Sequence, residues 1–380
     1  MKVVINASSL ASPLTGIGRY TYNLAYELIK SNDIELSLFN GRQLTDVLPP
    51  LLEYKDQKYK TLLKSLIRDN VPYSHQILRL SREYFFKKST KESSFNIYHD
   101  PNYLCYKSDI PTITTVHDLS WIKYPELHPP ARVNAMNNYF EKSLASSVHI
   151  ITDSEFIKSE LESIYNYPKK NISTIMLGVD NNFRPRDEKD CLSVLRNIGI
   201  NYKKFILSVG TIEPRKNIKS VLSTYCLLPL SIQEEYPLVI IGMKGWLEKE
   251  NIRSIRKLST SKKIIFLDYI DDAKLAILFS SAKLLFYPSL YEGFGLPVLE
   301  AMASGTSVIT SNVSAIPEVI GRDSILHDPL DDDQFSQSIQ RLILDNEYRK
   351  NYEKKLLLRS KKFSWKKCST QTINVYKQFK

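Results

Sequence analysis

The chain has 380 residues, which is long for one hydrophobic core and suits two domains. Its 43% apolar and 24% charged residues are typical of a soluble globular protein, and no apolar run is long enough to span a bilayer. Four scattered cysteines favour a reducing cytoplasm and argue against a zinc site, while the net charge of +11 leaves an anionic partner open.

The first half of the chain alternates short apolar runs with helical patterns, starting from residues 1–7, which read as a strand rather than a signal segment. Expected strands are 3–6, 34–38, 95–99, 112–116 and 148–152. Expected helices are 19–28, the 61–88 region, 131–146 and 155–164. Gly16 and Gly18 follow the first strand and would let the backbone approach a ligand closely. The full G-x-G-x-x-G fingerprint is missing, which disfavours an NAD enzyme.

One basic segment, residues 54–91, carries ten basic and three acidic residues, so it holds +7 of the net charge of +11. Its apolar residues recur at roughly helical spacing. Such a segment can lie on anionic lipid, can pack on its own domain as an ordinary surface helix pair, or can contact nucleic acid. We expect an anionic membrane surface rather than nucleic acid as its partner.

His117 and Asp118 follow the expected strand 112–116, which places both side chains at a carboxyl edge of a sheet. His117 could donate a hydrogen bond to a substrate hydroxyl, although a lone histidine at a strand end more often has a structural role. Asp118 could instead cap the following turn. The segment 153–155 (Asp-Ser-Glu) reads as a plain helix N-cap.

A second series of apolar runs begins near residue 205, after a polar stretch at 181–190 that is expected to join two domains. Expected strands are 205–209, 238–242, 264–267, 284–287 and 307–310. Expected helices are 218–227, 248–258, 272–281 and 333–344. Buried strands alternating with helices predict an α/β fold of two doubly wound parallel-sheet domains facing a central cleft. The expected divisions are 1–182, 190–360 and a C-terminal helix, 361–380, that crosses back to the first domain.

Two cationic side chains follow the first strand of the expected second domain. A buried strand ends at Gly210, and Arg215 and Lys216 lie on the turn before the next helix. A planar arginine fork and a lysine point charge at a helix start suit a diphosphate.

The segment 291–300 (Tyr-Glu-Gly-Phe-Gly-Leu-Pro-Val-Leu-Glu) links an apolar strand to a short helix. Gly293 and Gly295 lie on the turn, where backbone N–H groups and the helix dipole favour an anion. Glu292 and Glu300 flank this turn. An anion cradle between two acceptors suits a ligand with phosphates and hydroxyls, such as a sugar nucleotide.

These segments together resemble the retaining glycosyltransferases of family 4, a group with the GT-B fold. The resemblance covers most of the chain and rests on the E-x7-E segment from Glu292 to Glu300 and on residues 209–217, 116–119 and 16–18. The chain departs from many members at Thr211, where they have arginine, and at Leu177, where they have asparagine. The nearest likeness is to bacterial mannosyltransferases that build O-polysaccharides from GDP-mannose.

The resemblance implies a role for each matching residue. The donor diphosphate would be bound by Gly16, Arg215, Lys216, Gly295 and Leu296. Glu292, Gly293 and Phe294 would contact the donor sugar, Glu300 would contact the ribose, and His117 would lie beside the sugar. Glu292 and His117 are the expected catalytic residues.

The expected reaction is hexose transfer with retention, without a metal, because Arg215 and Lys216 can stabilise the leaving diphosphate. The acceptor would be a lipid-linked glycan for cell-surface polysaccharide (O-antigen) synthesis. The enzyme is expected in the cytoplasm, peripheral at the inner face of the membrane. A UDP-sugar-dependent transferase of the same fold and a sugar-nucleotide epimerase remain alternatives, as do a sugar phosphorylase and a nucleic-acid binder.

Overall fold

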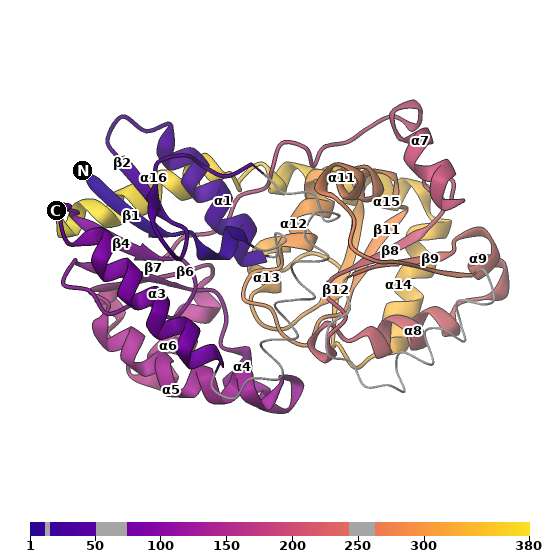
Figure 1. The fold of residues 1–380 in the computed structure, drawn as a ribbon. Coiled ribbons are helices and arrows are strands. Elements are labelled where there is room, and N and C mark those ends of the chain that lie inside the picture. Colours follow the sequence, from indigo (N-terminus) through magenta and orange to yellow (C-terminus); the bar gives the residue numbers. More distant parts are fainter. Residues whose placement is uncertain (12–15, 51–73, 243–262) are drawn as a thin grey trace. The chain divides into compact units, whose positions relative to one another are not determined.

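The computed structural model describes residues 1–380 except 12–15, 51–73 and 243–262 (Figure 1). The chain divides into two compact units. Unit 1 comprises Met1–Leu119, Ala131–Gly178 and Trp365–Lys380, and unit 2 comprises Ser120–Pro130 and Val179–Ser364. Sequence analysis assigned residues 120–130 to the first domain, whereas in the structure this stretch is part of unit 2.

Unit 1 contains a seven-stranded sheet in the order β3-β2-β1-β4-β5-β6-β7. The strands are β1 (Lys2–Asn6), β2 (Glu35–Phe39), β3 (Leu44–Thr45), β4 (Ile97–Asp100), β5 (Thr112–Val116), β6 (His149–Thr152) and β7 (Ile172–Thr174). Every residue of β4, β5 and β6 is buried, as expected for strands covered on both faces. The all-parallel expectation is wrong at one edge, because the short β3 pairs antiparallel with β2.

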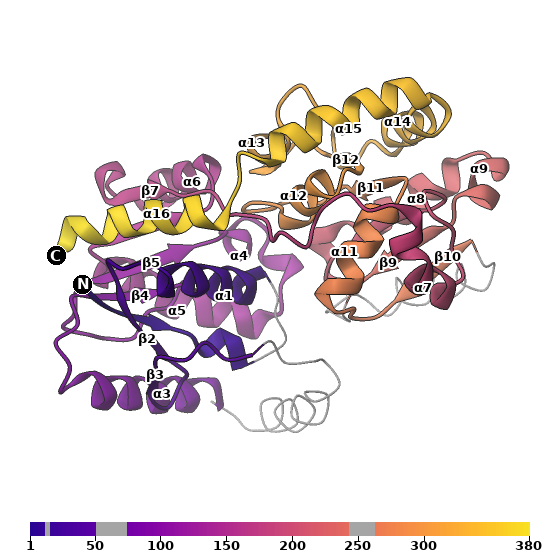
Figure 2. The ribbon, with the colours of Figure 1, turned by 90° about the horizontal axis from the view of Figure 1, so that it is seen from above.

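The helices of unit 1 include the C-terminal helix of the chain. They are α1 (Gly16–Ile29), α3 (Ser74–Thr90), α5 (Pro130–Ser146), α6 (Glu155–Tyr165) and α16 (Trp365–Tyr376). Figure 2 shows α16, in yellow, running beside α1 although the two are far apart in sequence. The rings of Tyr20 and Trp365 meet there, with centroids 6.3 Å apart.

Unit 2 contains a six-stranded parallel sheet in the order β10-β9-β8-β11-β12-β13. The strands are β8 (Ile206–Val209), β9 (Leu238–Ile241), β10 (Ile264–Leu267), β11 (Leu284–Tyr287), β12 (Ser307–Ser311) and β13 (Leu326–His327). The helices are α4 (Ser120–Lys123), α7 (Glu188–Ile198), α8 (Ile218–Leu227), α9 (Leu230–Glu235), α11 (Asp272–Ser281), α12 (Leu296–Ala303), α13 (Ile316–Ile320), α14 (Asp332–Leu344) and α15 (Asn346–Ser360).

The predicted doubly wound fold is confirmed in both units. Each sheet winds outward in two directions from a central pair, β1 and β4 in unit 1 and β8 and β11 in unit 2. The expected helices 218–227 and 272–281 match α8 and α11 residue for residue, and the latter begins where Asp271 accepts a hydrogen bond from the Lys274 amide. The expected helix 248–258 lies outside the described residues. None of the helices that the structure describes is long and apolar enough to cross a bilayer.

Candidate active site

The candidate site lies where the winding of the unit 2 sheet reverses direction. Strands β8 and β11 are hydrogen-bonded neighbours whose carboxyl ends are at Val209 and Tyr287. In open α/β sheets, ligands bind at the carboxyl ends of the strands at this switch point. The segments that follow these two strands carry Arg215, Lys216 and Glu292, so the topology brings the two separate sequence motifs together.

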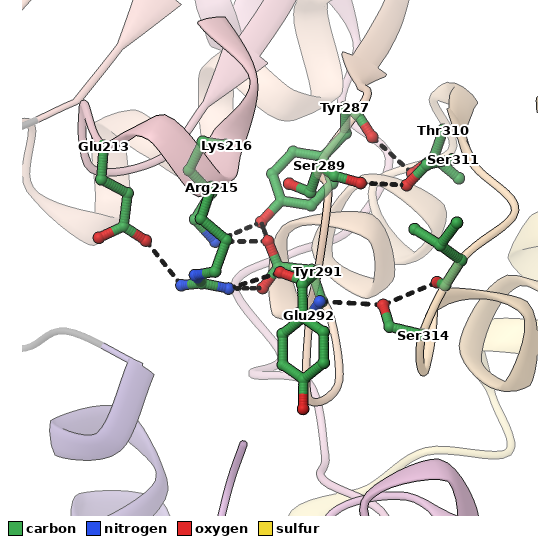
Figure 3. Close-up of polar contacts among 11 residues, drawn as sticks. Glu213, Arg215, Lys216, Tyr287, Ser289, Tyr291, Glu292, Thr310, Ser311 and Ser314 are labelled. Carbon is green, nitrogen blue, oxygen red and sulfur yellow. Dashed lines mark hydrogen bonds and ion pairs between the residues drawn. The ribbon is translucent and has the colours of Figure 1, made fainter. Parts of the chain in front are cut away.

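Glu292 is the centre of a buried polar cluster (Figure 3). Lys216 Nζ donates to Glu292 Oε1 over 2.6 Å, and Arg215 Nη1 donates to Glu292 Oε2 over 3.0 Å. Tyr287 Oη donates to Glu292 Oε1 over 2.7 Å and accepts from Lys216 Nζ over 2.8 Å. The Glu292 side chain therefore holds both predicted phosphate-binding cations.

Arg215 also ties together the two segments that form the site. Its Nη1 donates to the Tyr291 carbonyl over 2.7 Å, and its own carbonyl accepts from the Leu290 amide over 2.9 Å. Its Nη2 donates to Glu213 Oε1 over 2.7 Å. Two carboxylates thus face two cations in the cluster. Sequence analysis missed Glu213 and Tyr287, since a strand-end tyrosine and a loop glutamate carry no motif of their own.

The environment keeps Glu292 ionised. Burial raises the pKa of the carboxyl, but the Lys216 and Arg215 cations and the hydrogen bonds outweigh burial and lower the pKa of Glu292 to about 2. Burial and the Glu292 charge raise the pKa of the Tyr287 phenol well above its ordinary value, so this group stays a hydrogen-bond donor. Burial and the neighbouring Arg215 lower the pKa of Lys216 below its ordinary value, and the attraction of Glu292 offsets only part of this fall.

Backbone geometry fixes the two turns of the site. Asn217 has a left-handed conformation with φ of 54°, and its side chain donates to the carbonyls of Pro288 and Pro329 over 3.0 and 2.7 Å. Gly295 has φ of 98°, and a Cβ there would lie 2.6 Å from Ile316 Cδ1. A larger residue at Gly295 would therefore disturb both the backbone and the packing.

The other predicted residues of this motif continue into α12. Gly293, Phe294 and Gly295 are buried, and Leu296 is the first residue of the helix. Glu300 is buried one turn further along α12 and is not among the residues bonded to Glu292. The Glu292 backbone is fixed from the other side, where its amide donates to Ser314 Oγ over 2.9 Å.

The stretch 120–130 contributes an aromatic neighbour that sequence analysis did not identify. Tyr124 meets Tyr291 edge to face, with ring centroids 5.8 Å apart. The Tyr291 carbonyl is the acceptor for Arg215, so this aromatic contact lies next to the cluster.

The remaining predicted residues, His117 and Gly16, belong to unit 1. His117 follows β5 and is buried, with Nδ1 2.6 Å from Asp153 Oδ2 and Nε2 2.9 Å from the Pro101 carbonyl. A substrate hydroxyl would have to share or replace the Pro101 contact. Gly16 is the exposed first residue of α1, and a Cβ there would meet no atom of the described residues within 4 Å.

Metal-ligating side chains do not gather anywhere in the described part of the chain, in which no group of three or more His, Cys, Asp or Glu could hold an ion. The positive charge next to the E-x7-E segment is supplied by Arg215 and Lys216.

Solved structures define the class to which this architecture belongs. Sucrose-phosphate synthase from Thermosynechococcus elongatus superposes with a TM-score of 0.73 at 19% identity, covering 99% of this chain and 98% of that one. WaaG, a glycosyltransferase involved in lipopolysaccharide biosynthesis, superposes with a TM-score of 0.71 at 12% identity, covering 99% of both chains. Units 1 and 2 are the two Rossmann-like domains of the GT-B fold.

Sequence comparison is more specific. Residues 196–356 match the family described as "Glycosyl transferases group 1", and residues 14–183 match "Glycosyltransferase Family 4". O-antigen chain mannosyltransferase B of Escherichia coli is 36% identical over 382 residues, covering 99% of this chain and 100% of that relative. The chain belongs to glycosyltransferase family 4, and it is a glycosyltransferase.

Proposed function

We propose that this enzyme transfers mannose from GDP-mannose, with retention, onto a lipid-linked glycan in O-antigen synthesis. The mannosyl group and the O-antigen context are supported by the full-length likeness to the Escherichia coli mannosyltransferase. The observation that carries the proposal is the Arg215–Glu292–Lys216 cluster at the switch point of unit 2. It offers fixed cations in a buried setting, where electrostatic interactions are strong.

The cluster suits a diphosphate because its donors are held in place before the ligand arrives. An ammonium group can donate three hydrogen bonds, and the structure gives Lys216 Nζ two acceptors, Tyr287 Oη and Glu292 Oε1. The third direction would serve a phosphate oxygen. Glu292 lowers the cost of burying the cations, and the arriving diphosphate adds negative charge to a cluster that is otherwise balanced.

The remaining roles follow the same arrangement. The Gly295 and Leu296 amides at the start of α12 would bind the diphosphate, as helix N-termini do. Glu292, Gly293 and Phe294 would border the donor sugar, and Glu300 would accept hydrogen bonds from the ribose hydroxyls. From unit 1, Gly16 would allow close approach of the diphosphate and His117 would face the sugar.

Transfer is proposed to be metal-independent. The developing charge on the leaving GDP would be stabilised by Arg215, Lys216 and the α12 terminus. Excess EDTA should leave the rate of transfer unchanged, and restoration of a lost rate by added Mg²⁺ or Mn²⁺ would overturn this part of the proposal.

The described part of the basic segment supports a membrane-bound acceptor. On α3, the side chains of Ile77, Leu80 and Tyr84 are 59%, 67% and 65% exposed, and their spacing places them on one helical face. The opposite face is anchored by Phe86, which is fully buried, and by Arg79, which donates to the Leu104 and Cys105 carbonyls over 3.2 and 2.8 Å. Residues 54–73 of the segment lie outside the described residues.

An exposed apolar stripe with lysines beside it favours the surface of an anionic bilayer. The double variant Ile77→Ser/Leu80→Ser should lose most binding to vesicles containing phosphatidylglycerol. Val47→Ser, at a residue that is 72% exposed in the same unit, should bind like the parent. Equal loss in both variants, or none in either, would contradict a specific role for α3.

The function is tested by incubating the enzyme with GDP-mannose or UDP-glucose and a lipid-linked O-antigen acceptor. We expect mannose transfer from GDP-mannose, with the product linkage in the same anomeric configuration as the donor by NMR. Transfer only from UDP-glucose would keep the fold and chemistry but change the sugar. Interconversion of the sugar nucleotide without transfer would favour the epimerase alternative.

A further inference from the structure

We propose that Asp153 is a positioning residue that keeps a hydrogen on both ring nitrogens of His117, so that the ring acts only as a hydrogen-bond donor toward the sugar. This inference rests on the proposed placement of His117 beside the donor sugar. Its geometry, however, lies entirely within unit 1.

Strand register brings the two residues together. Strands β5 and β6 are parallel neighbours in which Val116 pairs with Thr152. His117 and Asp153, the residues that directly follow these strands, therefore lie at the same carboxyl edge of the sheet. His117 Nδ1 is 2.6 Å from Asp153 Oδ2. Both side chains are nearly inaccessible, with 8% and 2% exposure for the two residues. The contact between His117 and Asp153 is therefore fixed by the strand register of the sheet and not by flexible surface side chains.

The hydrogen-bond partners of the His117 ring determine which of its nitrogens carry a hydrogen. The Pro101 carbonyl can only accept, so His117 Nε2, 2.9 Å away, must carry a hydrogen. A carboxylate at Nδ1 also accepts, so an ionised Asp153 requires a second hydrogen there. The pair is then an imidazolium and a carboxylate in direct contact, and neither ring nitrogen has a lone pair available for a substrate proton.

Aromatic side chains surround the ring. Tyr20 and Tyr103 meet it edge to face, with centroids at 4.9 and 5.6 Å. Tyr20 is itself held by Thr115, 3.0 Å from its hydroxyl, and Thr115 lies 2.8 Å from His99 Nε2. His99 Nδ1 lies 2.6 Å from the Tyr376 hydroxyl on α16. The ring is thus fixed through a chain of contacts that ends on the C-terminal helix.

The carboxylates around the His117 ring favour its protonated form. Burial alone would lower the pKa of His117, but Asp153, the Pro101 carbonyl and Asp118 together raise it above the ordinary 6.5. Burial raises the pKa of Asp153 above its ordinary value, and the contact with His117 offsets only part of that rise. The other titratable groups nearby stay neutral, because burial lowers the pKa of His99 to about 3 and raises those of Tyr20 and Cys368.

The consequence is a pH dependence of known sign. A raised pKa in the folded state means that the pair stabilises the fold at low pH and loses this contribution as pH rises through the folded value. The strength of the ring as a donor should decline as pH rises through the same value, because the lost proton removes the positive charge that strengthens its remaining N–H group.

The test uses Asp153→Asn, which keeps the shape of the side chain. An asparagine amide can donate to Nδ1, so the ring can stay in place with a hydrogen only on Nε2. Asp109→Asn, at an exposed carboxylate of the same unit, is the matched control. Two quantities are measured, the ¹⁵N shifts of the His117 ring against pH and the pH profile of kcat for transfer.

In the parent enzyme and the control, both ring nitrogens should show protonated shifts at pH 7. In Asp153→Asn, the pKa of the ring should fall because the carboxylate that raises it is gone. We expect kcat to drop by about ten-fold or more, with a smaller change in KM, because only the orientation and charge of the donor have changed. The alkaline decline of kcat should move to lower pH with the ring.

A parent ring with a single hydrogen at pH 7 would overturn the proposal, even if the variant failed to fold. So would an Asp153→Asn enzyme whose ring titrates lower while kcat and its pH profile stay unchanged. Failure of the proposed function is distinguishable, because the parent would then not transfer mannose from GDP-mannose while the ring shifts would still report the state of the pair.

Discussion

The two units share one strand order but fill their switch points differently. Between β1 and β4 of unit 1, Asn6 Nδ2 donates to Asp100 Oδ2 over 2.8 Å, and Tyr98 Oη donates to the same oxygen over 2.7 Å. Between β8 and β11 of unit 2, the corresponding place holds Arg215, Lys216 and Glu292. The same topology thus closes one switch point with neutral donors on a buried carboxyl group and places two cations, paired with two carboxylates, at the other.

This difference in charge indicates which of the two polar clusters is suited to bind an anionic ligand. Asp100 is fully buried, and burial raises the pKa of its carboxyl despite hydrogen bonds from Asn6, Tyr98 and the Asn102 amide. The hydrogen-bond donors of this cluster are neutral, so they offer an anion no positive charge. The unit 2 cluster places two cations at the same topological position, so variants of the two clusters should separate activity from stability.

The largest effect is expected for Lys216→Ala. Loss of the ammonium removes a fixed charge from the proposed diphosphate site, and kcat should fall about 10²–10³-fold, as for the loss of other preorganised electrostatic donors. Lys219→Ala, on the exposed face of α8, is the matched control and should keep parental kcat. Steady-state kinetics with GDP-mannose measures both, and equal rates in the two variants would remove Lys216 from the site.

A smaller loss is expected for Glu292→Gln. The amide keeps some hydrogen bonds to Lys216 and Arg215 but removes the charge that balances them, so the cations lose their fixed orientation. We expect kcat to fall about 100-fold. A variant with parental kcat would show that Glu292 only supports the fold.

The same variant has a predictable effect on acid stability. The lowered pKa of Glu292 contributes stability above the unfolded value of 4.5, and this contribution is lost as pH falls toward about 2. Urea unfolding between pH 5 and pH 2.5 should show a steeper loss of stability in the parent than in Glu292→Gln. Parallel curves would contradict the ionic character of this cluster.

A moderate effect is expected for Tyr287→Phe. The phenol bridges Lys216 and Glu292, and its loss should reduce kcat about ten-fold because two hydrogen bonds that orient the ammonium disappear. Tyr225→Phe serves as a control, since its hydroxyl donates to backbone carbonyls in the same unit and does not touch the cluster in the described part of the chain. Equal kinetics in the two variants would show that Tyr287 does not orient the cluster.

The smallest effect on catalysis is expected for Asn6→Ala. Removing one donor from the buried Asp100 should lower the free energy of unfolding by about 1–3 kcal/mol while kcat changes little. Denaturant unfolding and kinetics on the same sample separate the two. A loss of kcat as large as that of Tyr287→Phe, without loss of stability, would mean that both switch points serve the ligand.

Much of this arrangement is predictable from the sequence. Continuous apolar runs gave the central strands, and β5, β10 and β11 begin and end where expected. The edge strands β3, β7 and β13 were missed because each has only two or three residues, at most one of them buried, and no pattern. Helix α15 was missed because its largely polar sequence buries few residues, among them Tyr352 and Leu356.

The site shows the same limit. Arg215, Lys216 and Glu292 could be proposed from local motifs, but their mutual contacts depend on β8 and β11 being neighbours. Asp153 was interpreted as part of a helix N-cap, and the capping side chain is in fact Ser154, which accepts from the Ile157 amide. The pairing of Asp153 with His117 requires the register of two strands, which no local pattern encodes.

The most direct test of the central claim is calorimetric binding of GDP and of guanosine to the parent and to Lys216→Ala. If the Arg215–Glu292–Lys216 cluster holds the diphosphate, GDP affinity should fall about 10–100-fold in the variant, while guanosine should bind both proteins equally. Equal GDP affinity in the parent and the variant would contradict the claim that this cluster is the diphosphate site.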